Sequence, residues 1–210
     1  MNHKENMLRG ELYLASDPEL RQLHRHALQL TARYNRTDDE QETLRQQLLE
    51  ELLGSCPQHL HIEPTFRCDY GFNITIGEEF FANYDCILLD VCPITIGRHV
   101  MLGPRVCIYT AAHPLDRTVR DAQWEYGQPV TIGDSVWIGG NVVINPGVTI
   151  GSDVVIGSGS VVTHDLPSHV IAAGNPCRVL RPISPQDQRI WQRRWDQVLA
   201  RQKAESDRES

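Results

Sequence analysis

The aliphatic residues between Val130 and Val162 recur every six positions. One register contains isoleucines and a final valine: Ile132, Ile138, Ile144, Ile150, Ile156 and Val162. A second register contains only valines: Val130, Val136, Val142, Val148 and Val154. A helix repeats about every 3.6 residues and a simple strand about every two, so neither element produces this period. Short strands that are joined by tight turns and stacked as coils do produce it, and the pattern therefore predicts a parallel β-helix.

The same register starts earlier in the chain and is broken twice. It is visible at Ile74–Ile76 and again at Ile94–Ile96, where two extra residues separate the units. It disappears between Ile108 and Ile132, because residues 110–129 contain no hexad. A long loop without periodicity inside a compact solenoid is more often functional than not. We therefore expect the chemistry to lie at the breaks.

Helical periodicity is confined to the two ends of the chain. Residues 16–34 open with Ser-Asp-Pro-Glu, a capping-box pattern, and continue with apolar residues three and four positions apart. A second capping signal at Thr37–Glu40 precedes a leucine stripe that stops at Gly54. Ser184-Pro185 begins a C-terminal helix, which we expect to fray after Leu199, where the chain becomes polar.

These patterns divide the chain into three parts. Residues 1–58 form an N-terminal helical segment, and residues 59–182 form an all-β core from which the loop 110–129 protrudes. Residues 183–210 form a C-terminal helix with a polar tail. In the corners between strands, glycine, asparagine and aspartate are expected to provide the positive φ that tight turns require.

Composition excludes several classes of protein. The net charge of −7 argues against a nucleic-acid partner or an anionic membrane surface. The N-terminus has no apolar core of a signal peptide, and no apolar run is long enough to cross a bilayer, so we expect a cytoplasmic protein. The six cysteines form no C-x-x-C pair, which predicts buried reduced thiols and no zinc site.

Among the nine histidines, His113 is the one that lies inside the long break of the repeat. Histidine suits a general base because its ordinary pKa of about 6.5 is close to working pH. The alternative, which the pattern alone leaves open, is that the His113-Pro114 pair simply begins a loop.

Several short motifs are informative only in combination. They are Tyr13-Leu-Ala-Ser-Asp17, Glu63-Pro-Thr-Phe-Arg-Cys-Asp-Tyr-Gly71, Phe81-Ala-Asn83, His113-Pro114, Val136-Trp-Ile-Gly-Gly140 and Gly174-Asn-Pro176. With the hexads they resemble the hexapeptide-repeat acyltransferases, in particular the maltose, galactoside and nodulation O-acetyltransferases, over about residues 4–182. The resemblance implies a left-handed parallel β-helix. It also implies a homotrimer with acetyl-CoA-dependent active sites between subunits.

The resemblance assigns the catalytic roles. His113 matches the catalytic histidine of the family, and Glu125 matches the acidic residue that supports this histidine in maltose-type members. A carboxylate on the second ring nitrogen would orient the imidazole and stabilise its protonated form. The alternative for Glu125 is a solvated carboxylate on a charged loop.

The resemblance also assigns acceptor-binding residues. They are Asp17, Asp69, Asn83 and Asp90, whose side chains suit sugar hydroxyls. For Asp17 the alternative is a helix cap, and for Asp69 and Asp90 it is a corner carboxylate that hydrogen-bonds its own turn.

The matching cofactor positions are Asn83, Gly140, Ser158, Thr163, His164, Arg178 and Arg181. Without a side chain, Gly140 allows its N–H to approach the thioester carbonyl as an oxyanion donor. The two arginines would pair with the phosphates of coenzyme A, unless they form only surface ion pairs. His164 departs from the family, whose members usually carry lysine there.

The expected function is therefore acetyl-CoA-dependent O-acetylation of a small, maltose- or glucose-like sugar by direct transfer. One alternative is a non-sugar acceptor, such as an antibiotic or an amino acid, and another is a non-catalytic trimeric scaffold. A zinc-dependent carbonic anhydrase of the same fold needs three converging histidines. Only His99 and His113 lie near suitable coils, so no metal is expected.

Overall fold

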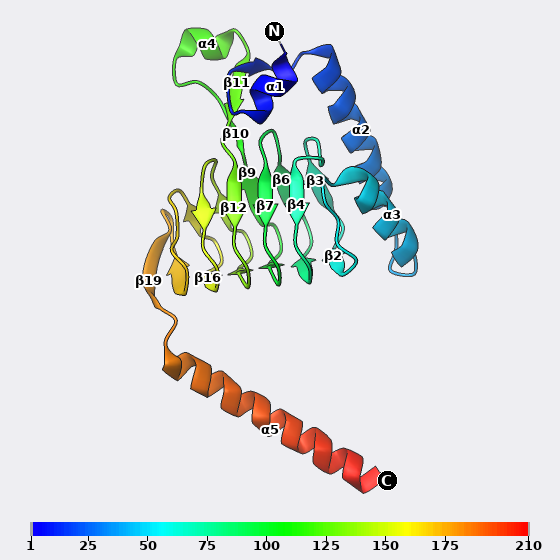
Figure 1. Cartoon of the computed structure of the whole chain (residues 1–210), viewed down its shortest axis with the longest axis vertical. Coiled ribbons are helices and arrows are strands. Elements are labelled where there is room, and N and C mark those ends of the chain that lie inside the picture. The colour runs from blue at the N-terminus through cyan, green and yellow to red at the C-terminus, as the bar shows by residue number, and fades with distance from the viewer. Residues whose placement is uncertain (1, 210) are drawn as a thin grey trace.

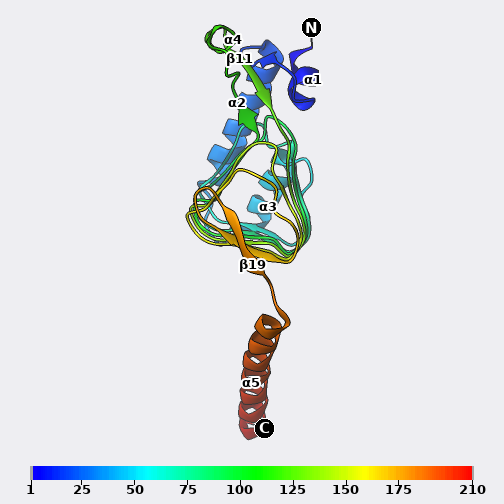
Figure 2. The same ribbon diagram turned by 90° about the vertical axis from the view of Figure 1, so that its left-hand side faces the viewer.

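The structure, a computed structural model, describes residues 2–209, with side chains through Asp207. Its core is a triangular prism in which each coil contributes one strand to each of three parallel walls (Figures 1 and 2). We name the walls in chain order. The first wall contains β4 (Ile74–Ile76), β7 (Ile94–Ile96), β12 (Val130–Ile132) and β15 (Thr149–Ile150).

The other two walls are built in the same way. The second wall contains β2 (Leu60–Ile62), β5 (Phe80–Ala82), β8 (Met101–Leu102), β13 (Trp137–Ile138), β16 (Val154–Ile156), β18 (Val170–Ala173) and β19 (Arg178–Pro182). Its last strand, β19, is the exception and runs antiparallel to β18. The third wall contains β3 (Phe66–Cys68), β6 (Cys86–Leu89), β9 (Cys107–Tyr109), β14 (Val143–Ile144) and β17 (Val161–Val162).

The six-residue register runs through the inside of this prism. Ile132 pairs with Ile96 on one side and Ile150 on the other, and the remaining register positions pair with their equivalents in the same way. All of them are buried in one continuous hydrophobic core. Burial of each such side chain contributes roughly 1.5–3 kcal/mol. The predicted parallel β-helix is confirmed.

The corner glycines have two different roles. Left-handed φ angles occur on the expected residue types, such as Gly147 (φ 82°) and Asn141 (φ 58°), and also on others, such as Glu79 (φ 56°). Gly97 does not have a positive φ, but a Cβ there would lie 2.7 Å from the carbonyl oxygen of Gly133. Glycine is required at this corner because neighbouring coils approach closely, and the expectation that corner glycines provide positive φ is wrong here.

Both breaks of the register lie at the corner between the third and the first wall, which we call the third–first corner. Ile76 pairs with Ile96, whereas Thr131 pairs with Thr149, so the coil at the short break is two residues longer. The long break forms β10 (Ala111–Ala112), α4 (Arg117–Asp121) and β11 (Trp124–Gly127). These strands form a separate sheet with β1 (Tyr13–Leu14), in the order β1-β11-β10.

The N-terminal helices close one end of the prism and reach the long loop. They are α1 (His3–Leu8), α2 (Pro18–Tyr34) and α3 (Glu42–Leu52). Leu48, Leu49 and Leu52 of α3 join the core of the prism, while α1 lies beside β11 (Figure 1). The N-cap of α2 is Asp17, the alternative given for this residue, and not Ser16 as the capping-box pattern implies; Pro18 lies in the first turn, as the sequence predicts. The predicted start of α3 at Thr37–Glu40 is wrong, because the helix begins at Glu42 after Gln41.

The C-terminal helix α5 (Pro185–Glu209) projects away from the prism (Figures 1 and 2). It remains helical through Glu209, so the predicted fraying after Leu199 is wrong; Met1 and Ser210 lie outside the described residues. Trp191 and Trp195 are 64% and 60% exposed. Their shared face does not pack on the coils of its own chain.

Candidate active site

The long loop brings His113, Glu125 and Tyr13 to one place through a strand register. Ala111 pairs with Gly127 and Ala112 with Tyr126; His113 directly follows the last of these pairs, and Glu125 directly precedes Tyr126 on β11. On the other side of β11, Tyr13 pairs with Glu125. Directly opposite residues of antiparallel strands point to the same face. Glu125 therefore lies on the middle strand, between Tyr13 and the position of His113.

The exposure of His113 and the partial burial of Glu125 suit a general base and the carboxylate that supports it. The His113 side chain is exposed, whereas Glu125 is half-buried and accepts a hydrogen bond of 3.0 Å from the Tyr13 hydroxyl. No hydrogen bond joins Glu125 to His113 in the described chain. Catalytic hydrogen bonds are often long without substrate and tighten when it binds. The loop can therefore present an accessible imidazole beside a fixed carboxylate.

Asp90 lies at the third–first corner, directly after β6, and is fully buried. Its Oδ1 accepts hydrogen bonds from the N–H groups of Asp69 (3.0 Å) and Tyr70 (2.8 Å), and its Oδ2 accepts one from Asn73 (3.3 Å). Burial raises the pKa of Asp90 to about 7, although the backbone hydrogen bonds act in the opposite direction. The carboxyl group holds the turn of the preceding coil and not its own turn, which the corner alternative predicts.

Tyr70 marks the place where four predicted site residues gather. Burial, followed by Asp69, Glu125, Asp90 and Asp17, raises the pKa of its hydroxyl well above the ordinary value. Asp69 itself is half-buried, and burial raises its pKa while His24 lowers it. The structure therefore brings Asp17, Asp69, Asp90 and Glu125 together.

Asp17 belongs to this group and also caps a helix. Its Oδ1 accepts the N–H groups of Glu19 (3.0 Å) and Leu20 (3.3 Å) at the start of α2. Asp17 therefore acts as a helix cap, the alternative that the sequence left open. Its Oδ2 has no hydrogen-bond partner among the described residues.

Asn83, Gly140 and Ser158 lie elsewhere, at the corner between the second and the third wall, which we call the second–third corner. Asn83 N–H bonds to Leu102 one coil on, and Gly139 N–H bonds to Ile156 in the same way, so these positions form a column. The Asn83 amide oxygen accepts the N–H of Tyr84 at 2.8 Å. Gly140 N–H makes no hydrogen bond within residues 2–209. Within one chain, these groups are on a different corner from the loop.

The remaining cofactor positions lie toward the C-terminal end of the prism. Thr163 and His164 follow β17, and the Thr163 hydroxyl contacts His164 Nδ1 at 2.9 Å. Arg178 and Arg181 lie on the exposed strand β19. Arg181 forms two hydrogen bonds of 2.6 and 2.9 Å with the Asp187 carboxylate, which lowers the pKa of Asp187. A phosphate would have to compete with Asp187 for this guanidinium.

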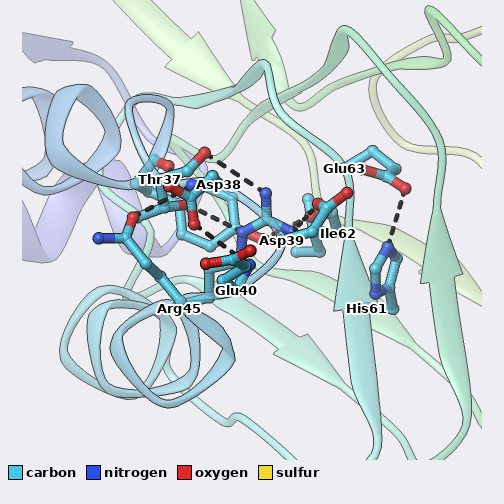
Figure 3. A network of polar contacts seen from close by, with 10 residues as sticks. Thr37, Asp38, Asp39, Glu40, Arg45, His61, Ile62 and Glu63 are labelled. Carbon is cyan, nitrogen blue, oxygen red and sulfur yellow. Dashed lines mark hydrogen bonds and ion pairs between the residues drawn. The ribbon is translucent and has the colours of Figure 1, made fainter.

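A groove of about 920 Å³ lies between α3 and strands β2 and β5, and none of the predicted site residues lines it. Arg45 there pairs with Asp39 (3.1 Å) and bonds to the Thr37 hydroxyl (2.8 Å), while His61 pairs with Glu63 at 3.1 Å (Figure 3). These contacts tie the α2–α3 turn to α3 and support the first coil. We assign this groove no catalytic role.

Three further observations concern the cysteines, candidate metal ligands and membrane-spanning helices. All six cysteines are free, as predicted, and burial raises the pKa of Cys86 and Cys92 to about 11, so neither thiol is an effective nucleophile. Residues 2–209 contain no cluster of three His, Cys, Asp or Glu side chains arranged to hold a metal ion. Within the same residues, no helix is long and apolar enough to span a membrane.

Comparison with known proteins identifies the family. The maltose acetyltransferase hexapeptide capping motif matches residues 6–57, and the bacterial transferase hexapeptide repeat matches residues 129–164. Nodulation protein L of Rhizobium meliloti is 47% identical over 176 residues, which cover 84% of this chain and 96% of that protein. The chain belongs to the hexapeptide-repeat acetyltransferases.

Solved structures of hexapeptide-repeat acetyltransferases agree with this assignment. A maltose O-acetyltransferase from Clostridium difficile is 52% identical with a TM-score of 0.86, covering 88% of this chain and 98% of that one. A hexapeptide-repeat acetyltransferase from Vibrio cholerae in complex with acetyl-CoA is 41% identical with a TM-score of 0.81, covering 88% and 100%. The expected left-handed parallel β-helix with helices at both ends is confirmed.

Two tyrosines of the site have no role in the sequence-based assignment. Tyr13 and Tyr70 both lie in motifs that carry the family resemblance, but no spacing connects either of them to Glu125. The contact with Glu125 forms only when the N-terminal helical segment, which we call the N-terminal arm (residues 2–58), folds back on the long loop. The Tyr13–Glu125 hydrogen bond joins residues more than a hundred positions apart.

Proposed function

We propose that this acetyltransferase moves the acetyl group of acetyl-CoA to a hydroxyl group of a small, maltose- or glucose-like sugar in the cytoplasm. The observation that carries the proposal is the row Tyr13–Glu125–His113, formed where the repeat breaks. It sets an exposed imidazole beside a half-buried carboxylate, the pairing that general-base catalysis uses.

Transfer is direct. His113 takes the proton of the acceptor hydroxyl as its oxygen attacks the thioester carbonyl carbon, and Glu125 stabilises the imidazolium. The tetrahedral oxyanion accepts a hydrogen bond from Gly140 N–H, which has no partner among residues 2–209. The carbon–sulfur bond then breaks, and the coenzyme A thiolate takes the proton from His113. No acetyl-enzyme forms, in keeping with the raised pKa of the buried thiols.

The site is completed between chains of a homotrimer. The base lies at the third–first corner, and Asn83, Gly140 and Ser158 lie at the second–third corner of the same prism. Closed symmetry can bring unlike faces of identical subunits together. The loop of one chain then faces the second–third corner of its neighbour, where acetyl-CoA binds. Thr163, His164, Arg178 and Arg181 contact the cofactor further along the prism.

The acceptor binds on the side of the N-terminal arm. Asp69, Asp17 and Glu125 all lie near Tyr70, and Asn83 of the neighbouring chain adds an amide. Carboxylates and amides accept hydrogen bonds from sugar hydroxyls in the geometry that specificity requires. Asp90 contributes by holding the turn that carries Asp69. The maltose O-acetyltransferase among the structural neighbours supports a sugar acceptor.

A panel of acceptors tests the proposal. Purified protein is supplied with acetyl-CoA and maltose, glucose, a galactoside, glucosamine, an aminoglycoside, an amino acid or no acceptor, and thiol release and acetylated product are measured. We expect sugar-dependent thiol release and an alkali-labile O-acetyl product. Transfer only to the antibiotic or the amino acid contradicts a sugar acceptor, and absence of transfer to any acceptor contradicts the enzyme.

The His113→Ala variant is the matched test of the base. Loss of a general base lowers the rate by about 10²–10⁴-fold. The fold should be unaffected, because the side chain is exposed. Retention of wild-type turnover by this variant refutes the assignment of His113.

A further inference from the structure

The Tyr13 hydroxyl is the group nearest to the proposed catalytic pair that the mechanism leaves unused. It donates a hydrogen bond of 3.0 Å to Glu125 Oε2, and Tyr13 and Glu125 are direct partners in the β1–β11 ladder. The two residues are 112 positions apart in the sequence. The N-terminal arm therefore reaches the loop that carries His113 through a side chain as well as through its backbone.

The surroundings of Tyr13 hold its ring in place. The side chain is fully buried and packs in a small hydrophobic cluster with Met7, Leu20, Tyr70 and Val91. A buried aromatic ring with close contacts on every side has no alternative rotamer without unpacking its neighbours. The phenol oxygen is therefore a fixed point, whereas the longer Glu125 side chain is the flexible partner.

The arm and the loop are packed closely around this contact. Gly10 has a φ of +74°, and a Cβ there would lie 2.6 Å from the carbonyl oxygen of Gly127 at the end of β11. The Cys92 thiol donates to the carbonyl oxygen of Met7 at 3.0 Å. The arm thus sets the position of β11, and Tyr13 sets the position of one carboxylate on that strand.

The phenol is a donor throughout the range of working pH. Burial, followed by the nearby Glu125 carboxylate, raises the pKa of Tyr13 far above its ordinary value. The neutral hydroxyl can therefore donate its hydrogen bond to Glu125 Oε2 at any working pH. Tyr13 supplies a neutral donor where three other carboxylates crowd the site.

We propose that Tyr13 is a positioning residue, whose hydroxyl holds Glu125 Oε2 so that the other oxygen, Oε1, is presented to the imidazole of His113. The inference rests on the proposed function, since it requires His113 to act as the base. Tyr13 touches neither substrate nor the reacting atoms and acts only through Glu125.

A double-mutant cycle tests this role. Turnover is measured for wild type, Tyr13→Phe, Glu125→Gln and the double variant, with the best sugar acceptor. Tyr13→Phe keeps the ring and removes only the hydrogen bond, so we expect kcat to fall about tenfold while KM for acetyl-CoA stays within about twofold. In the Glu125→Gln background the same change should alter kcat by less than about twofold, because the group on which Tyr13 acts is already impaired.

Tyr34→Phe is the matched control. Tyr34 is also buried, lies on the same arm, and donates its hydroxyl to the carbonyl oxygen of Ile62, far from the loop in sequence. Its loss should lower the melting temperature and leave kcat unchanged. An unchanged kcat in Tyr13→Phe, or an equal loss in both Glu125 backgrounds, overturns the positioning role. Wild-type protein without activity on any acceptor overturns the proposed function, and the role of Tyr13 with it.

Discussion

At the scale of the residue, the third–first corner shows how burial changes what a carboxyl group does. Asp90 and Asp69 belong to successive coils, yet Asp90 is enclosed by backbone N–H groups while Asp69 remains half-exposed near the loop. Both residues resemble acceptor-binding positions in sequence. Only the structure shows that Asp90 has its hydrogen-bonding capacity occupied by the turn that holds Asp69.

Asp90 also predicts a dependence of stability on pH. An aspartate in the unfolded chain ionises near pH 3.9, whereas the pKa of folded Asp90 is raised to about 7. Between these values the folded state binds the extra proton, so this contribution to stability is complete below about pH 4 and is lost as the pH rises to about 7.

The Asp90→Asn variant lacks this titration. In urea unfolding, we expect the free-energy difference between wild type and Asp90→Asn to favour wild type more at pH 5 than at pH 8. A difference that is the same at both pH values contradicts the raised pKa.

At the scale of the element, the sequence predicts what depends on local periodicity. The coils follow from the register of Ile132 and its equivalents, and α2 follows from Asp17 and Pro18. The start of α3 was mispredicted because the Thr37 hydroxyl contacts Arg45 instead of capping a helix. The absence of hexads in the long loop can be seen in the sequence. Its β10–β11 hairpin and its pairing with β1 cannot, because they depend on tertiary contacts that leave no periodic pattern.

Variants of Asp17 distinguish its role as a helix cap from its proposed role in binding the acceptor. Removal of the capping side chain in Asp17→Ala should lower the free energy of unfolding by about 1 kcal/mol, and Asp17→Ser should restore most of it. Both variants lack the free carboxylate oxygen, so KM for the sugar should rise in both. If Asp17→Ala unfolds at the same urea concentration as wild type, the cap does not contribute to stability.

At the scale of the whole molecule, the proposed base lies at the third–first corner, whereas Asn83, Gly140 and Ser158 lie at the second–third corner of the same prism. The sequence places His113 and Glu125 at the break and Gly140 in an intact coil, but it does not place them relative to each other. That relation depends on which wall each coil segment joins and on how copies pack. The walls and corners can be described from a single chain. Whether corners of different chains contact each other depends on how the chains assemble.

The helix α5 is the other feature that belongs to this scale. Because α5 buries little against the prism, a chain that ends at Ile183 should melt within about 2 °C of the full chain. The Arg181–Asp187 ion pair is lost, but an exposed pair is screened by solvent and contributes little to stability. A drop of more than about 5 °C together with a smaller assembly would show that Trp191 and Trp195 pack on another copy.

Subunit complementation tests most directly whether the long loop of one chain and the second–third corner of its neighbour form one active site. His113→Ala removes the base, and Gly140→Ile places a side chain against Pro104, where a Cβ already lies 3.1 Å from a carbonyl oxygen, and blocks the oxyanion donor. Each variant alone should be nearly inactive. In randomly mixed trimers, about one site in four combines an intact base with an intact neighbouring corner, so about a quarter of wild-type turnover should return. Mixed trimers that are no more active than the separate variants would contradict the account.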